Sequence, residues 1–248
     1  MSQYPLSVQL YTVRDAIASD LPTALERVAG IGFRTVELYG FVERADEYSE
    51  LLPANGLSAP TAHARLVGAD LAPIFAAAKK IGIGTLIDPM IDRALWTSAD
   101  DVARSADALG EIARAAADHG LRIGYHNHWW ELENRIDGTP ALEVFAEHLS
   151  DDVVLEVDTY WAEVGGVPAA GLLERLGDRV VAIHVKDGPI TQVNTEQVAA
   201  GDGAVDVLGI LAAAPQARRV VELDDFDGDV FTALVGSFAY LTAHGESA

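Results

Sequence analysis

The chain has 248 residues, of which 50% are hydrophobic and 22% are charged, and it contains no cysteine. This composition is typical of a globular α/β protein and excludes a disordered chain, a disulfide framework and a thiolate metal site. The 17 basic and 38 acidic residues give a net charge of −21, which repels nucleic-acid phosphates and anionic membranes and excludes both as expected partners.

No linker, low-complexity block or charge run divides the chain, so we predict a single domain over residues 1–248. Residues 1–15 lack the basic region and long apolar run of a signal peptide, and no stretch reaches about 18 uninterrupted apolar residues. We therefore expect a soluble, cytoplasmic protein.

Short β-branched runs alternate with longer amphipathic stretches along the whole chain. In chain order, the runs predicted to be strands are residues 7–13, 35–40, 58–64, 85–90, 122–128, 153–161, 180–187 and 218–225. Strict alternation predicts a parallel sheet, and eight units of about 31 residues suit closure into a single (β/α)8 TIM barrel. An open doubly wound sheet is the alternative. It normally has a Gly-rich phosphate turn after its first strand, and residues 11–16 (YTVRDA) are not such a turn.

The longest connection between predicted elements runs from Gly188 to about Asp206. Loops of this length are uncommon and are often lids or binding loops. A surface excursion without function is the alternative.

Polar residues recur as pairs, two positions apart, at the ends of the predicted strands. These pairs are Gln9 and Tyr11, Glu37 and Tyr39, Thr61 and His63, His126 and His128, Glu156 and Asp158, His184 and Lys186, and Glu222 and Asp224. Residues two apart share a strand face, and burying them costs free energy unless they meet one another, a ligand or a metal. Their expected meeting point is the C-terminal mouth of the barrel, where active sites of this fold lie.

A metal site is predicted from the strand-end histidines and carboxylates. Asp158, His184 and Glu222 lie on three consecutive predicted strands and can converge on one point. A fourth ligand should come from the preceding strand, where His126 is our choice and where His128 and Glu131 are the alternatives. Imidazole and carboxylate ligands suit one divalent ion, Mn²⁺, Mg²⁺, Co²⁺ or Zn²⁺. A polar network without metal is the other interpretation.

Other mouth residues are candidates for contact with a substrate. Aromatic rings stack on the C–H faces of a small polyhydroxylated ligand, while polar groups bind its hydroxyls. The predicted substrate-binding residues are Gln9, Tyr11, Glu37, Tyr39, Glu131 and Trp161. A lysine aimed into a barrel needs an anionic partner, so Lys186 is a predicted catalytic residue together with His63 and His128.

Several segments give the chain a family resemblance. They are VQLYTVRD near the start, GYHNHWWEL at 124–132, LEVDTYWAEVGG at 155–166, IHVKDG at 183–188, GDGAVD at 201–206 and VVELDD at 220–225. In their order and spacing the chain resembles the xylose-isomerase-like barrel superfamily, the sugar phosphate isomerase/epimerase group that includes inosose dehydratases and ketose 3-epimerases. The resemblance runs nearly end to end.

The resemblance implies a metal held by Glu, Asp, His and Glu from strands five to eight. Asp158, His184 and Glu222 match the last three ligands. Where many relatives have Glu in a Glu-Asn-His run, this chain has His126. Of the two metal-bound carboxylates that ketose epimerases use, only Glu222 therefore remains.

The resemblance also implies an isomerase or epimerase of a small sugar or cyclitol that acts through a metal-stabilised enediolate, with Glu222 as the base. A dehydratase or lyase that eliminates from an inosose or a 3-keto glycoside is the alternative, because inosose dehydratases carry a comparable His-rich run. A non-catalytic sugar-binding or partner subunit is a third hypothesis. The endonuclease branch, which acts at abasic DNA sites, is excluded by the charge. Dimers and tetramers are common among such barrels, so a homo-oligomer is one expectation.

Overall fold

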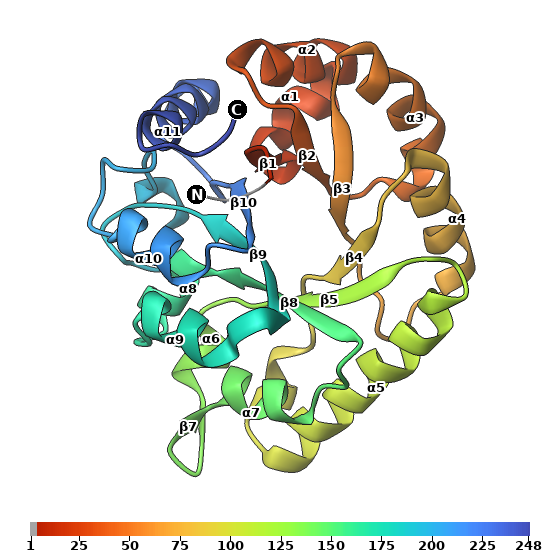
Figure 1. Cartoon of the computed structure of the whole chain (residues 1–248), viewed down its shortest axis with the longest axis vertical. Helices are drawn as coiled ribbons and strands as arrows, with labels where there is room; N and C mark the ends of the chain where they lie inside the picture. The colour runs from red at the N-terminus through yellow and green to blue at the C-terminus, as the bar shows by residue number, and fades with distance from the viewer. Residues whose placement is uncertain (1–3) are drawn as a thin grey trace.

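Eight parallel strands close into a barrel surrounded by helices in the computed structural model, which describes residues 4–248 (Figure 1). The order around the barrel is β1, β10, β9, β8, β5, β4, β3 and β2. The strands are β1 (Ser7–Gln9), β2 (Thr35–Leu38), β3 (Ser58–His63), β4 (Thr85–Asp88), β5 (Arg122–His126), β8 (Val153–Asp158), β9 (Val180–Val185) and β10 (Arg218–Val221). The predicted (β/α)8 barrel is confirmed, and the open sheet is excluded because β1 pairs with both β2 and β10.

Helices follow the strands on the outside of the barrel (Figure 1). The α-helices are α1 (Arg14–Ser19), α2 (Leu21–Ile31), α3 (Ala45–Ala54), α4 (Leu71–Ile81), α5 (Ala99–Ala117), α6 (Trp130–Glu133), α7 (Ala141–His148), α8 (Thr159–Val164), α9 (Ala169–Leu176), α10 (Val207–Ala213) and α11 (Val230–Ala243). Short 3-10 helices are η1 (Leu10–Val13), η2 (Val42–Arg44), η3 (Arg93–Trp96), η4 (Gly177–Arg179) and η5 (Asn194–Glu196). In the described part of the chain, no helix is both long enough and apolar enough to cross a membrane.

The barrel wall separates apolar from polar side chains. In β2, Val36 and Leu38 join the buried apolar cluster, whereas Glu37 between them contacts the His184 ring of β9. Because side chains alternate between the faces of a strand, this pattern packs the apolar face against the helices and turns the polar face inward. The barrel interior is therefore a polar site enclosed by an apolar layer.

Several predicted strands end earlier than expected, because a helix or a turn begins at once after them. The segment 153–161 is strand only to Asp158, whose carboxylate accepts a hydrogen bond from Trp161 N (2.9 Å) and caps α8. Likewise β10 ends at Val221, so Glu222 and Asp224 lie on the turn that follows it. These side chains are therefore fixed by loops and caps at the mouth.

A small hairpin was not predicted. Strands β6 (Arg135–Ile136) and β7 (Thr139–Pro140) pair antiparallel, and the turn residues Asp137 and Gly138 both have positive φ (50° and 91°). Asp-Gly is the typical sequence of such a two-residue turn. The hairpin lies between α6 and α7, away from the barrel strands.

The long loop after β9 is held in place by one buried carboxylate. Asp187 accepts hydrogen bonds from four backbone N–H groups, those of Gly188, Gly201, Gly203 and Val205, at 2.8 to 3.0 Å. A carboxylate that accepts several N–H bonds acts as the organising centre of a loop. These four bonds hold the two ends of the loop together.

Gly165→Ala is expected to destabilise the protein by about 1–3 kcal/mol, the usual cost of overpacking. Gly165 is buried at the end of α8, and a Cβ there would lie 2.6 Å from Trp129 O and 2.8 Å from Leu132 Cβ. The matched control is Gly30→Ala, inside α2 with nothing within 4 Å, which should stabilise by about 0.5–1 kcal/mol. Urea unfolding measures both. Equal effects of the two substitutions would contradict the packing argument.

Candidate active site

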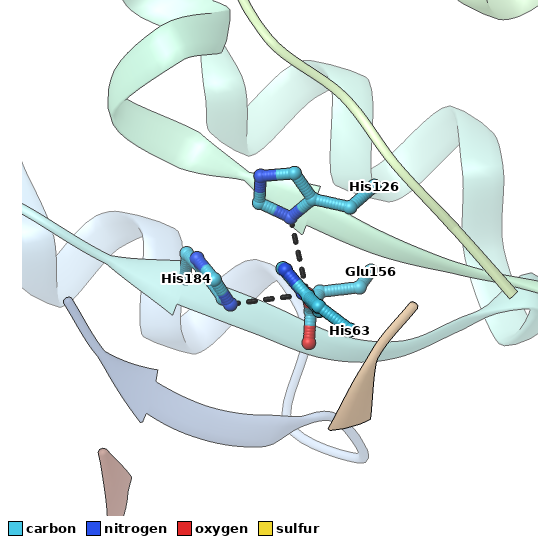
Figure 2. A group of neighbouring side chains, drawn as sticks. All are labelled: His63, His126, Glu156 and His184. Carbon is cyan, nitrogen blue, oxygen red and sulfur yellow. Dashed lines mark hydrogen bonds and ion pairs between the residues drawn. The ribbon is translucent and has the colours of Figure 1, made fainter. Parts of the chain in front are cut away.

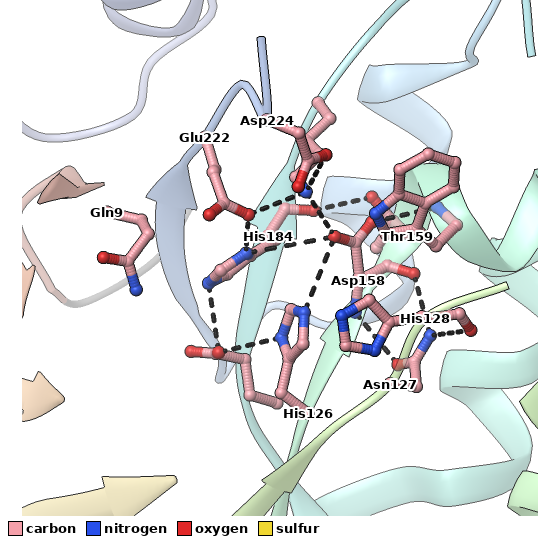
Figure 3. A network of polar contacts seen from close by, with 12 residues as sticks. Gln9, His126, Asn127, His128, Asp158, Thr159, His184, Glu222 and Asp224 are labelled. Atoms are coloured by element: carbon pink, nitrogen blue, oxygen red, sulfur yellow. Dashed lines mark hydrogen bonds and ion pairs between the residues drawn. The ribbon is translucent and has the colours of Figure 1, made fainter. Parts of the chain in front are cut away.

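Polar side chains from six strands meet at the C-terminal end of the barrel. His63 and His126 are the last residues of β3 and β5, and Asp158 is the last residue of β8. Two cross-strand hydrogen bonds fix the ends of these strands: Asp158 N donates to Asn127 Oδ1 (3.0 Å), and Thr159 Oγ1 donates to His184 O (2.8 Å). Figure 3 shows the resulting network around His184.

An inner cluster within the barrel consists of His63, His126, Glu156 and His184. Each offers one ligand atom, and these atoms all lie within 4.8 Å of one another. Glu156 Oε1 is at the centre, 2.6 Å from His63 Nε2, 3.1 Å from His126 Nδ1 and 3.0 Å from His184 Nε2 (Figure 2). Three imidazoles around one buried carboxylate form a ligand set that suits a transition metal.

An outer cluster, Asp158, His184 and Glu222, lies beside the inner one. Its ligand atoms also lie within 4.8 Å of one another. His184 belongs to both clusters, because its Nδ1 is 2.7 Å from Glu222 Oε2 while its Nε2 faces Glu156. The four predicted metal ligands are thus divided: three form the outer cluster, and His126 lies in the inner one, with its Nε2 3.8 Å from Asp158 Oδ2.

A buried lysine neutralises the acidic side of the outer cluster. Lys186 Nζ lies 2.8 Å from Asp158 Oδ2, 2.7 Å from Glu222 Oε2 and 2.7 Å from Asp224 Oδ2. Burial lowers the pKa of Lys186, but these three carboxylates raise it well above the usual value. The ammonium is therefore charged, as the anionic surroundings predicted for this lysine require.

The buried carboxylates retain free coordination capacity. Glu37 Oε2 and Glu156 Oε2 are buried and have no hydrogen-bond partner among residues 4–248. A buried carboxylate oxygen without a partner is costly, and a cation would satisfy it. The donor set therefore fits a divalent metal at this end of the barrel.

The protonation of the inner cluster depends on its own charges. Burial lowers the pKa of His63, but Glu37 and Glu156 raise it to about 10. Burial and Glu37 raise the pKa of Glu156, but His184, His63 and His126 together lower it to about 2. The metal-free cluster therefore holds ionised Glu156 against protonated His63.

This arrangement predicts a pH effect on the stability of the metal-free protein. Because the pKa of His63 rises on folding from 6.5 to about 10, its stabilising contribution is complete below about pH 6.5 and is lost as the pH rises through about 10. The stability advantage of the wild type over His63→Gln should shrink across this interval. Urea unfolding in EDTA at a series of pH values measures it, and a difference independent of pH would contradict the assignment.

A cavity of about 720 Å³ opens over the clusters. The polar residues that line it include His63, His126, His128, Glu222 and Asp224. Among the predicted substrate contacts, Tyr11 and Tyr39 line the cavity. Their rings meet edge to face, with the ring centroids 5.3 Å apart. These residues are therefore in place to contact a ligand.

The remaining predicted substrate contacts are buried and bonded to protein groups. Gln9 Nε2 donates to Glu37 Oε1 (2.9 Å), and Glu131 accepts from Tyr125 OH (2.7 Å) and from His128 N (2.9 Å). Trp161 is buried, with its ring 5.6 Å from Lys186 Nζ. None of Gln9, Glu37, Glu131 and Trp161 is among the described residues that line the cavity.

Three further polar residues belong to the site but were absent from the predicted set. Glu156 is the centre of the inner cluster, and Asp224 binds Lys186. Gln197, from the loop after β9, donates to Asp224 Oδ2 (2.8 Å) and accepts from Asp224 N (2.7 Å). The pair pattern signalled Glu156 and Asp224, whereas no sequence pattern signalled Gln197.

The chain is a closed (β/α)8 barrel whose C-terminal mouth carries clustered histidines and carboxylates that could hold a metal ion. Residues 25–222 match the family model described as xylose isomerase-like TIM barrel, and the chain belongs to this family. The sequence is 28% identical over 91 residues to an inosose dehydratase from Glaesserella parasuis; the match covers 36% of this chain and 30% of that protein.

Solved structures agree with the fold. The chain superposes on a sugar phosphate isomerase/epimerase from Parabacteroides distasonis with a TM-score of 0.81 and 22% identity, covering 98% of this chain and 95% of that one. It also superposes on the IOLI protein, which was crystallised with a bound zinc atom, with a TM-score of 0.71 and 15% identity, covering 97% and 96%. The resemblance inferred from the sequence motifs is confirmed.

Proposed function

We propose that the protein is a metal-dependent isomerase or epimerase of a small sugar or cyclitol. The observation that carries the proposal is the position of Glu222. Its carboxylate contacts His184 and Lys186, and the residue lines the ligand-sized cavity. Asp158, His184 and Glu222, with His126 beside them, are the proposed metal ligands. A divalent ion held there would polarise the substrate carbonyl and stabilise the enediolate.

Glu222 is the proposed base. Burial raises its pKa, but Lys186 and His184 lower it well below the usual value, so it is ionised and able to accept the proton from the carbon next to the carbonyl. Lys186 holds this carboxylate in place and offers a positive charge to a substrate oxygen that becomes negative. His63 and His128, which also line the cavity, are the proposed groups that return a proton.

Elimination is the second candidate function. The described residues that line the cavity include three imidazoles, those of His63, His126 and His128, and the carboxylate of Glu222. The Asp224 carboxylate also lines it but is bonded to Lys186 and Gln197. One carboxylate base with imidazole acids suits removal of a carbon-bound proton and protonation of a departing hydroxyl. The similarity to an inosose dehydratase supports the same reading.

The deciding experiment is NMR of the Mg²⁺- or Zn²⁺-loaded protein in D₂O with ketoses, inososes and 3-keto glucosides. Deuterium at the α-carbon with an isomeric product is the expected result. Loss of water or of an aglycone would establish the elimination instead. Stable metal binding without exchange in any of these compounds would contradict both and favour a binding protein.

A further inference from the structure

The cavity above the clusters is lined by both polar and apolar residues. Its apolar wall is formed by Tyr39, Val42, Ile74, Pro89 and Met90. These residues come from the connections after β2 and β4 and from α4, whereas the chemistry proposed above lies chiefly on β5 and β8 to β10. Because β2 and β4 lie across the closed barrel from β8 and β10, a sugar held beside Glu222 would have this apolar surface facing it.

The cavity is also larger than a free sugar needs. At about 720 Å³ it lies in the range of roughly 300–1,000 Å³ that encloses drug-sized ligands. A monosaccharide would leave the apolar wall in contact with water. Apolar surface that faces an active-site cavity gains free energy when a ligand group covers it.

The apolar wall is preformed. The Asp88 carboxylate at the end of β4 accepts hydrogen bonds from Met90 N (3.0 Å), Leu66 N (2.9 Å) and Val67 N (3.0 Å). It thereby ties the connection after β3 to the connection after β4. Backbone that is fixed in this way presents Pro89 and Met90 without an ordering cost when a ligand binds.

The charges near this wall do not select an ionic group. Glu43 and Arg65 both line the cavity, both are exposed, and they carry opposite charges. The polarizable thioether of Met90 and the Tyr39 ring favour contact with an aromatic ring.

We propose that the substrate is a sugar or cyclitol that carries a neutral aryl substituent, and that the aryl group packs on the apolar wall. The inference rests on the proposed function, because it places the reacting sugar carbon beside Glu222. It names a substrate class, aryl glycosides in their keto form, that the fold and the metal site do not specify.

The test compares phenyl and methyl 3-keto-β-D-glucopyranoside as ligands of the Zn²⁺-loaded protein, with affinity measured by calorimetry. The phenyl compound should bind at least about tenfold more tightly, because an added buried ring contributes apolar contact. Met90→Gln, a half-buried position outside the apolar core cluster, should remove most of this preference and leave the methyl compound unaffected.

The matched control is Leu95→Gln on η3, an exposed apolar residue that does not line the cavity and should change neither affinity. If Met90→Gln does not fold, Val42→Thr supplies the same comparison. Equal binding of the two glycosides, or a preference that survives both substitutions, would overturn the inference. Absence of deuterium exchange despite a phenyl preference would count against the proposed reaction and leave the ligand class supported.

Discussion

Glu222→Gln should lower the rate of α-proton exchange by about a thousandfold while leaving the protein folded, because a general base contributes roughly 10²–10⁴ to the rate. The amide has the shape of the carboxylate and can still accept a hydrogen bond from His184 Nδ1 or Lys186 Nζ, each 2.7 Å from Glu222 Oε2. It cannot accept the substrate proton. NMR detection of deuterium at the substrate α-carbon measures the rate, and metal content is determined for each sample.

The matched control for this variant is Asp225→Asn. Asp225 lies three residues further along the same turn, is half exposed and pairs loosely with Arg14 at 4.0 Å. Its substitution should leave the exchange rate within about twofold, as is usual for a surface change away from the site. An unchanged rate in metal-loaded Glu222→Gln would remove Glu222 as the base.

Lys186→Met should destabilise the metal-free protein by about 3–5 kcal/mol, the usual cost of removing one partner from a buried ion pair. The side chain of Lys186 is 1% exposed, and its ammonium contacts the carboxylates of Asp158, Glu222 and Asp224. Without it, three acidic groups share a buried volume with too little positive charge. Urea unfolding in EDTA at pH 7 measures the loss.

Two comparisons make this prediction specific. Lys80→Met removes an exposed lysine that pairs with Asp46, and it should cost no more than about 1 kcal/mol. Adding Asp224→Asn to Lys186→Met should recover part of the loss, because it removes one of the uncompensated charges. A double variant that is less stable than the single variant would show that the acidic repulsion is not the cause.

The barrel itself was predictable because its signal is distributed over the whole chain. Eight apolar runs at regular spacing specify eight strands even though individual ends were wrong by several residues, as at Asp158, where a capped helix begins. The family motifs lie at the same strand ends. The fold and the family can therefore be predicted from patterns distributed along the whole chain, even where the predicted end of one strand is wrong.

The depth of each side chain within the barrel was not predictable. Both members of a pair such as Glu156 and Asp158 lie on the same face of β8, but a strand rises about 3.3 Å per residue, so the first member lies about 6–7 Å further down the strand. Gln9 is fully buried, whereas Tyr11 is 41% exposed. The same difference places Glu156 beneath Asp158 at the centre of the inner cluster, and it places Glu37 beneath Tyr39, out of reach of the cavity.

Contacts between distant loops could not be predicted from the sequence either. Gln197 reaches Asp224 from a loop that the Asp187 carboxylate holds through the N–H groups of Gly201 and Gly203. Nothing in the spacing of these residues reveals this, since the bonds depend on loop conformation and not on strand periodicity.

The position of the apolar wall has a consequence for how a barrel of this kind can diversify. The residues of the apolar wall, such as Val42 and Met90, belong to connections that supply none of the proposed metal ligands. Replacing those connections would change which molecule fits while the ligand geometry on the opposite half of the barrel stays intact. New loops grafted after β2 and β4 would therefore alter specificity, provided that β2 and β3 keep Glu37 and His63, which belong to the site.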